Sequence, residues 1–363
     1  MDEKTNNSRL RQTLLVAAAV LAALVFVVAL VRRGVAGGAG AASETPFLLD
    51  NSAGQVYAVS DGRLAVAANS GVQLFDADGN TVLHEIVSLS EPGITAGDRR
   101  VAAFDIGGTT LLVADFDGNV ARVEPAGAII SARMNADGEL AVATEAAGYK
   151  GMVTVYDEKL TAIYQWYSGT GYVMNAALSD AGTLAVLCAD ADGASVHLFS
   201  LDSEEERGVF QADEELFADL CWLDGGHVAA LSQTRLVLLD DRGQSTGEYA
   251  FDRLHLYDYS RDGSGFFTLA LSQYRSSSAT KLVTISPSGE VLGETEPPDG
   301  LEGVSACGKQ VLVQRGGKLT LYNQQLEELR SAETELHGVG RAILLQRGRA
   351  LLLSDDSAQV VEL

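Results

Sequence analysis

The chain alternates apolar and polar residues in short runs, and each run follows a tight turn that contains glycine. Residues 134–144 (MNADGELAVAT) and 178–188 (LSDAGTLAVLC) can be laid over one another. Each has a polar turn that ends in Gly138 or Gly182, then one polar residue, then an alternating apolar run. This pattern is typical of a β-strand that leaves a hairpin turn with one face buried.

The turn glycine recurs with a regular period, with neighbouring copies 35–45 residues apart. The positions are Gly62, Gly97, Gly138, Gly182, Gly225, Gly263, Gly308 and Gly348. A period of roughly 40–50 residues made of short strands is typical of a β-propeller with one blade per repeat. The predicted fold class is therefore all-β, a β-propeller.

Each repeat after residue 50 divides into four strands, named a to d from the axis outward. In the first repeat these strands are 55–60, 63–68, 71–76 and 81–87. Similar units follow at about 90–127, 128–171, 172–215, 216–253, 254–300 and 301–338. Seven full units therefore precede the C-terminal tail.

The tail supplies only three strands, at 341–346, 349–354 and 359–363. Residues 46–50 (PFLLD) precede the first a strand and have no partner in their own unit. We predict that they pair with the tail and close the ring, because closure removes an open edge that invites aggregation. The predicted count is eight blades, with seven as the alternative if residues 90–127 do not form a blade.

The N-terminal region predicts a membrane anchor. Residues 13–31 hold no charge, glycine or proline over 19 positions, which is long enough for a transmembrane helix. A cleaved signal peptide is the alternative, with Ala39-Gly40-Ala41 as its site. The predicted organisation is a cytoplasmic tail over 1–12, the span, a flexible linker over 32–43 and the propeller domain over 44–363.

Charge around the span predicts its orientation. Lys4, Arg9 and Arg11 precede it, whereas Arg32 and Arg33 follow it. The slight excess before the span predicts a single-pass protein of the cell membrane, with the N-terminus cytoplasmic and the propeller extracellular.

The overall charge and the cysteines narrow the function classes. The formal net charge is −23, a field that repels phosphate backbones, so nucleic acid is not an expected partner. Cys188, Cys221 and Cys307 fall in three different repeats, which favours buried free thiols over a zinc site or a disulfide framework. Unpaired thiols count against an oxidising compartment and so oppose export.

A resemblance adds to this interpretation. The stretch AAGYKGMVTVYD (146–157), followed by YQWYSGTGYVMNAALSDAG (164–182), resembles an uncharacterised family of membrane-anchored propeller proteins of Gram-positive, largely clostridial, bacteria. That family lies within the wider quinoprotein-like and WD40-like propeller group. The resemblance implies the fold and the anchor, and it implies no catalytic residue. The chain departs from WD40 repeats because no Trp-Asp dipeptide closes a c strand, and from quinoprotein enzymes because repeated tryptophan docking motifs are missing.

No motif predicts catalysis, a metal or a cofactor. The loops 76–80, 115–119 and 190–194 begin Asp-x-Asp-Gly but lack the glutamate that an EF-hand needs twelve positions from its start. Residues 260–267 (SRDGSGFF) faintly resemble a sialidase Asp-box but are interpreted as an a–b turn. There is no Gly-x-Ser-x-Gly elbow. The histidines are His84, His197, His227, His255 and His337, from different blades, and we expect partly buried strand positions for them.

The candidate site is a loop face. The longer predicted loops are b–c or d–a connections, which share one face, and binding residues often sit on loops held by a rigid scaffold. The predicted contacts are Tyr149, Trp166, Tyr167, Tyr274 and Arg275, since aromatic and arginine side chains often anchor interfaces. Packing between blades is the alternative for all of them, and it is the favoured interpretation for Tyr172.

These observations predict a membrane-tethered, non-enzymatic binding or scaffold module at the cell envelope. Its ligand is a protein or an envelope component, held on the b–c and d–a face. The alternative is a hydrolase, lyase or redox propeller with its site at the central axis, because propellers host many activities.

Overall fold

The computed structural model describes residues 45–363, except 51, 224, 335 and 337. The predicted tail, span and linker, residues 1–12, 13–31 and 32–43, all lie outside the described residues. Within the described part, no helix is long and apolar enough to cross a membrane.

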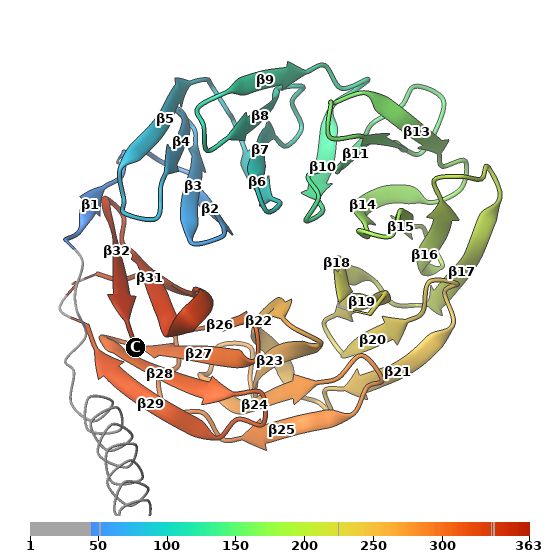
Figure 1. The fold of residues 1–363 in the computed structure, drawn as a ribbon. Helices are drawn as coiled ribbons and strands as arrows, with labels where there is room; N and C mark the ends of the chain where they lie inside the picture. The colour runs from blue at the N-terminus through green and yellow to red at the C-terminus, as the bar shows by residue number, and fades with distance from the viewer. Residues whose placement is uncertain (1–44, 51, 224, 335, 337) are drawn as a thin grey trace, which may run out of the picture. The chain divides into compact units, whose positions relative to one another are not determined.

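Eight four-stranded antiparallel sheets surround a central axis, as Figure 1 shows. The innermost a strands are β2 (Val56–Ser60), β6 (Pro92–Ala96), β10 (Ile129–Met134), β14 (Tyr172–Leu178), β18 (Phe217–Leu223), β22 (His255–Gly263), β26 (Gly303–Cys307) and β30 (Arg341–Leu344). The b strands are β3 (Arg63–Ala68), β7 (Arg100–Asp105), β11 (Leu140–Thr144), β15 (Thr183–Ala189), β19 (His227–Ser232), β23 (Phe266–Ser272), β27 (Gln310–Arg315) and β31 (Arg349–Leu353). We number the blades 1 to 8 in this order.

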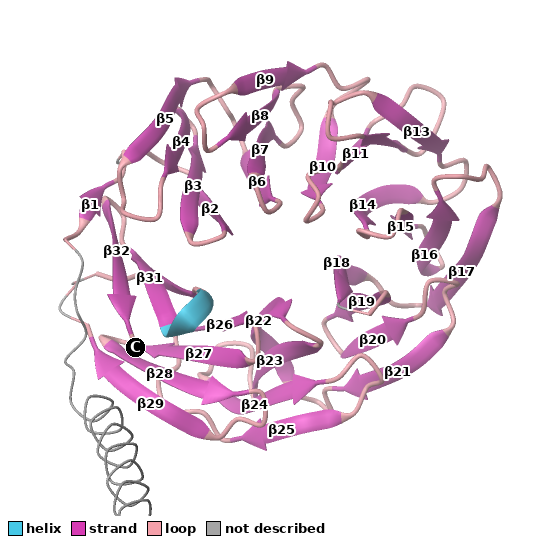
Figure 2. Cartoon of the chain, in the orientation of Figure 1, coloured by secondary structure: helices cyan, strands magenta, loops and turns pink. Residues whose placement is uncertain are grey.

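The outer strands complete each blade. The c strands are β4 (Gly71–Phe75), β8 (Leu111–Asp115), β12 (Met152–Tyr156), β16 (Gly193–Ser200), β20 (Arg235–Leu239), β24 (Ala279–Ile285), β28 (Lys318–Asn323) and β32 (Ser357–Glu362). The d strands are β5 (Thr81–Ile86), β9 (Val120–Val123), β13 (Ala162–Tyr167), β17 (Glu206–Asp213), β21 (Ser245–Ala250), β25 (Val291–Thr295), β29 (Glu328–Glu333) and β1 (Phe47–Leu48). In the described residues the one helix is a short 3₁₀ turn, η1 (Gln346–Gly348), shown in Figure 2.

The prediction of eight blades is confirmed, and residues 90–127 contain a regular blade, β6 to β9. Asp61 and Gly62 both adopt positive φ, of 48° and 77°, as a two-residue hairpin turn requires. One predicted turn glycine is displaced, because Gly263 ends β22 and Gly265, with φ of 73°, makes the turn.

The core lies between blades, and this changes the expected burial pattern. Every residue of β11 and β12 is buried, whereas β13 at the rim alternates between exposed and half-buried positions. Half-buried b and c strands were expected, but each blade is covered on both faces by its neighbours, so β11 and β12 are buried on both sides, polar residues such as Thr144 and Thr154 included. Small side chains such as Ala141, Ala143 and Ala185 let the sheets approach closely.

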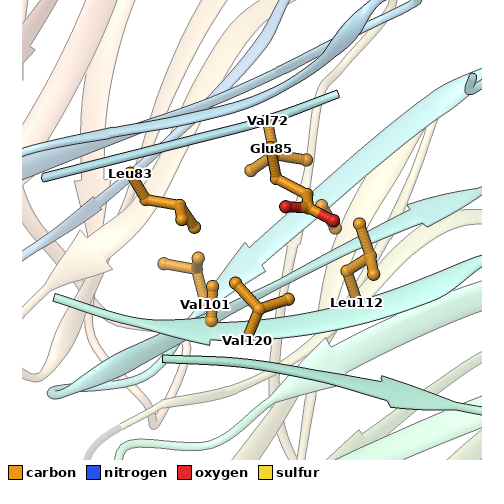
Figure 3. Close-up of a pocket in the computed structure, with 8 residues that line it drawn as sticks. Val72, Leu83, Glu85, Val101, Leu112 and Val120 are labelled. Carbon is orange, nitrogen blue, oxygen red and sulfur yellow. The ribbon is translucent and has the colours of Figure 1, made fainter. Parts of the chain in front are cut away.

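The seam between blades 1 and 2 illustrates this packing (Figure 3). Val72 and Leu83 of one blade face Val101 and Leu112 of the next, and the gap between them has no room for a water molecule. Glu85 lies at the same seam and forms an ion pair with Arg122 of blade 2 at 2.6 Å. The seam is therefore packed core with a polar edge.

Residues 46–50 close the ring as predicted. Phe47 and Leu48 of β1 pair antiparallel with Ala358 and Ser357 of β32, which gives blade 8 its fourth strand. The Phe47 ring lies 5.1 Å from the ring of Phe75, and Leu49 is buried in the same cluster. The N-terminal strand therefore joins blade 8 to blade 1 through both hydrogen bonds and apolar contacts.

We predict that deleting residues 44–50 makes the protein aggregate, because β32 then becomes an open edge and the Phe75 contact is lost. Deleting residues 1–40 is the matched control and leaves β1 in place, so this chain should stay soluble and melt cooperatively. Size-exclusion chromatography and thermal melts of both deletions provide the measurement. Identical behaviour of the two would contradict closure by β1.

Candidate functional site

The b–c and d–a connections share one face of the ring, but they are less elaborate than predicted. The longest are 145–151 and 273–278 between b and c strands, and 49–55, 296–302 and 334–340 between d and a strands. Other b–c turns have only two residues, such as 69–70. The c–d turns of the opposite face reach four or five residues, because each carries a hydrogen-bonded turn. The difference in loop length is thus confined to a few blades.

Tyr149 and Tyr167 are brought together on this face. Tyr149 lies on the 145–151 loop and Tyr167 ends β13, and their ring centroids are 4.8 Å apart. Their exposed fractions are 53% and 43%, which are high for paired aromatic rings. Two backbone hydrogen bonds of Lys150 hold the loop in place. The Lys150 N–H donates to the Ser168 carbonyl, and the Lys150 carbonyl accepts from the Val173 N–H.

Tyr172 extends the same surface, contrary to the expectation that it packs between blades. Its side chain is exposed, and the Lys150 ammonium lies 4.4 Å from its ring centroid. The same ammonium donates a hydrogen bond of 3.0 Å to the Tyr172 hydroxyl. Tyr172 is the first residue of β14, so its side chain projects at the sheet edge and not into the seam. We call Tyr149, Lys150, Tyr167 and Tyr172 the aromatic patch.

The Trp166 side chain points away from the aromatic patch, although Trp166 directly precedes Tyr167 on β13. Its half-buried side chain packs in the cluster between blades 3 and 4. Its ring lies 5.1 Å from the ring of Phe199 and 5.4 Å from that of His197. Successive side chains of a strand point to opposite sides, so Trp166 and Tyr167 contact different parts of the molecule.

Tyr274 and Arg275 form a separate position on blade 6. Both lie on the 273–278 loop, and Tyr274 is exposed. Arg275 donates through Nη2 to Gln233 Oε1 of blade 5 at 3.4 Å. The structure thus places the five predicted contact residues in three surroundings, and it joins only Tyr149 and Tyr167 directly.

Ser195, His197 and Glu206 form a chain of hydrogen bonds beside Trp166. Ser195 Oγ is 2.8 Å from His197 Nε2, and His197 Nδ1 is 2.5 Å from Glu206 Oε1. This order matches the contacts of a catalytic triad. However, β16 lies between β15 and β17, so the N–H groups of Ser195 and His197 serve the two ladders and cannot stabilise an oxyanion. His197 is a partly buried strand histidine, as expected.

Sequence reasoning missed a polar group at the centre of the ring. Asp219 of β18 is 6% exposed and accepts hydrogen bonds from residues of three other blades. Arg261 Nη1 of β22 donates at 2.9 Å and the Tyr259 hydroxyl at 3.0 Å, both to Oδ2. Arg133 Nη2 of β10 and Asn175 Nδ2 of β14 donate to Oδ1. We call these five residues the axial network.

Burial keeps two acidic groups at the axis protonated: the Tyr259 hydroxyl of the axial network and the thiol of nearby Cys221. Burial and the Asp219 carboxylate raise the pKa of Tyr259 to about 12, so its hydroxyl remains a donor at neutral pH. Burial raises the pKa of the nearby Cys221 thiol to about 12 despite both guanidinium groups. A protonated thiol is a poor nucleophile, so the arrangement is suited to binding a charge more than to covalent chemistry.

β-Bulges position this network. The register shifts in β10, β14, β18 and β22, and each shift is followed by a polar residue on the a strand. These residues are Ser131, Asn175, Asp219 and Asp258. A bulge redirects the side chains that follow it, which an alternating apolar pattern does not reveal. The recurrence of a polar residue at this place in four successive repeats is the signal that could have found it.

Two further regions are polar without forming a metal centre. A cleft of about 480 Å³ lies between β2 and β30 on the b–c and d–a face, lined in part by Tyr57, Arg341 and Asp355. The Asp76 carboxylate accepts from N–H groups of its own turn, which explains the Asp-x-Asp-Gly sequence locally. Among the described residues, no three His, Cys, Asp or Glu side chains are placed to hold a metal ion.

Comparison with known proteins identifies the fold. A model of a family of unknown function (DUF5711) matches residues 45–363. No curated protein matches the sequence. BamB from Moraxella catarrhalis is 17% identical, with a TM-score of 0.57 over 89% of this chain and 100% of that chain.

Two other solved structures show the same architecture. The computationally designed Ika8 protein is 12% identical, with a TM-score of 0.66 over 87% of this chain and 99% of that chain. The C-terminal WD40 domain of Sif2 is 12% identical, with a TM-score of 0.58 over 89% of this chain and 98% of that chain. At these identities the likeness shows the β-propeller fold alone.

We predict that Asp219→Ala lowers the free energy of unfolding by about 3–5 kcal/mol, because Arg133 and Arg261 then lose the buried carboxylate that pairs with both of them. Asp241→Ala is the control, since Asp241 pairs with Arg207 at 2.6 Å near the surface. Its loss should cost less than about 1 kcal/mol. Urea unfolding compares the two, and similar small effects would contradict a structural role for Asp219.

Proposed function

The chain belongs to a family of unknown function, DUF5711, and from this premise we propose that its propeller is a membrane-tethered binding module whose b–c and d–a face holds a protein or cell-envelope ligand. The observation that carries the proposal is the aromatic patch. Two exposed tyrosines in ring contact, with a third tyrosine beside a lysine, place apolar area and hydrogen-bond donors at one spot.

The distribution of exposed apolar side chains supports this face. Large exposed apolar residues that are not on outer d strands lie at the b–c and d–a connections or at the start of a strands. They are Ile106, Tyr149, Tyr172, Met174, Leu216, Tyr257 and Tyr274, with Tyr167 at the end of β13 beside them. Exposed aromatic and methionine side chains are enriched at the centres of interfaces.

The rigidity of the scaffold also favours binding. The patch residues stand on β13, β14 and a loop anchored by backbone hydrogen bonds on both sides. Tyrosine has few rotatable bonds, so a tyrosine held on a rigid sheet loses little conformational freedom when it meets a partner. A compact patch of this kind fits contact with another surface more than engulfment of a small molecule.

The tether is proposed from the sequence. The uncharged run 13–31 has slightly more positive charge before it than after it, so the N-terminus would be cytoplasmic and the propeller outside. The linker 32–43 would let the face turn toward ligands of the envelope.

The rival proposal is an enzyme with its site at the axis. The axial network is the group there, but its Tyr259 phenol and the nearby Cys221 thiol are held protonated, and its carboxylate is already bonded to two guanidinium groups. This chemistry favours binding over catalysis.

Substitution of the patch tests the proposal. We predict that Tyr149→Ala and Tyr167→Ala each change the free energy of unfolding by no more than about 0.5–1 kcal/mol, because both side chains are largely exposed. Each should weaken capture of the partner from envelope extracts by about tenfold or more, as loss of an interface anchor does.

Trp166→Ala is the matched control from the same strand. Its side chain packs in the seam, so this change should lower the free energy of unfolding by about 3 kcal/mol. Thermal melts and pull-downs are measured on all three variants. If the tyrosine variants melt as low as Trp166→Ala, or capture the partner like wild type, the patch is not the working surface.

Orientation is tested separately. Protease added to intact cells that express a C-terminally tagged chain should remove the propeller, because the charge bias places it outside. Lysed cells provide the control for cleavability. Full protection of the tag until lysis would place the propeller in the cytoplasm.

A further inference from the structure

We propose that the central channel binds a small monocarboxylate anion at the axial network, through the N–H groups of Arg133 and Arg261 that Asp219 leaves unused. This site is separate from the aromatic patch and goes beyond the proposed partner binding. Its failure would leave the proposal for the face intact, since no residue is shared.

The first step is charge. Among the described residues, Asp219 is the carboxylate that pairs with either guanidinium, so the bonded group of two arginines and one aspartate carries a formal charge of +1. Asp262 acts on Arg261 through space, but it is exposed and accepts its hydrogen bond from Ser260. Burial and the charge of Arg261 lower the pKa of Arg133, whereas the Asp219 carboxylate raises the pKa of Arg261 in spite of its burial, so Arg133 is the less compensated of the two cations.

The second step is hydrogen-bonding capacity. A guanidinium carries five N–H donors, and each arginine here uses one nitrogen for Asp219. The side chains are 23% and 33% exposed, so solutes in the channel can reach them.

The third step is the position of the guanidinium groups. Arg133 reaches from blade 3 to Asp219 on blade 5, past Asn175 of blade 4, which donates to the same carboxylate. Asn175, Ala176 and Ala177 are all buried. The partly exposed guanidinium groups are therefore more accessible from the channel than the blade 4 residues beside them.

The fourth step selects the ligand. A carboxylate matches the planar donor fork of arginine and can accept two parallel hydrogen bonds. A monoanion balances the formal charge of +1, whereas a dianion such as phosphate meets the Asp219 carboxylate with excess negative charge. The net charge of −23 further disfavours polyanions. One arginine balances the Asp219 carboxylate, so the second arginine leaves an excess positive charge that a bound anion would neutralise.

Calorimetric titration of the full chain, purified in detergent, tests this inference at low ionic strength. Acetate and propionate are the probes, with phosphate and chloride as comparators. Wild type is expected to bind the carboxylates and to melt at a higher temperature in their presence. Arg133→Gln and Arg261→Gln should each weaken binding by about tenfold or more, because each removes a charge-assisted hydrogen bond.

Arg122→Gln is the matched control, since Arg122 pairs with Glu85 on the outside of the ring and should leave carboxylate affinity unchanged. If a Gln variant does not fold, Arg133→Lys and Arg261→Lys keep the charge, lose the fork, and should weaken binding several-fold. The inference is overturned if wild type binds neither carboxylate, if phosphate binds more tightly, or if the arginine variants bind like wild type.

Discussion

Every blade of this protein must bury both of its faces, and the remaining features follow from that constraint. A four-stranded sheet is unstable alone, but between two neighbours its b and c strands become fully buried, as β11 and β12 are. Exposed polar groups then lie at the rim, the turns and the axis. The loops, which stand clear of the seams, and the a strands, whose inner edge faces the channel, are therefore well placed to meet a ligand.

The same constraint explains how neighbouring residues acquire unrelated roles. On β13, Trp166 turns into the seam toward Phe199, whereas Tyr167 meets Tyr149 at the surface. At the axis, Asp219 is held by residues from blades 3, 4 and 6 as well as its own, so one carboxylate links half of the ring. Loss of the Asp219 carboxylate would remove hydrogen bonds between several blades at once.

These two features also show what could be predicted from the sequence. Blade number and closure follow from local signals, the period of the turn glycines and an unpaired strand at 46–50, and both are confirmed. The prediction that Tyr172 packs between blades was wrong, because composition does not show on which side of a strand end an aromatic ring lies. The axial network was missed because it depends on bulges and on contacts between repeats about 40–90 residues apart, which no local pattern encodes.

The pairing of β1 with β32 has a consequence for biosynthesis. The ribosome makes Phe47 before the seven blades that separate it from Ala358, so the first strand of the ring waits until those blades have been made before its partner exists. Blades 1 to 7 can form during translation, since each takes its four strands from one continuous segment. The ring thus stays incomplete until β32 has been synthesised, and a chaperone that shields β1 during this interval would act on the protein only while it is being made.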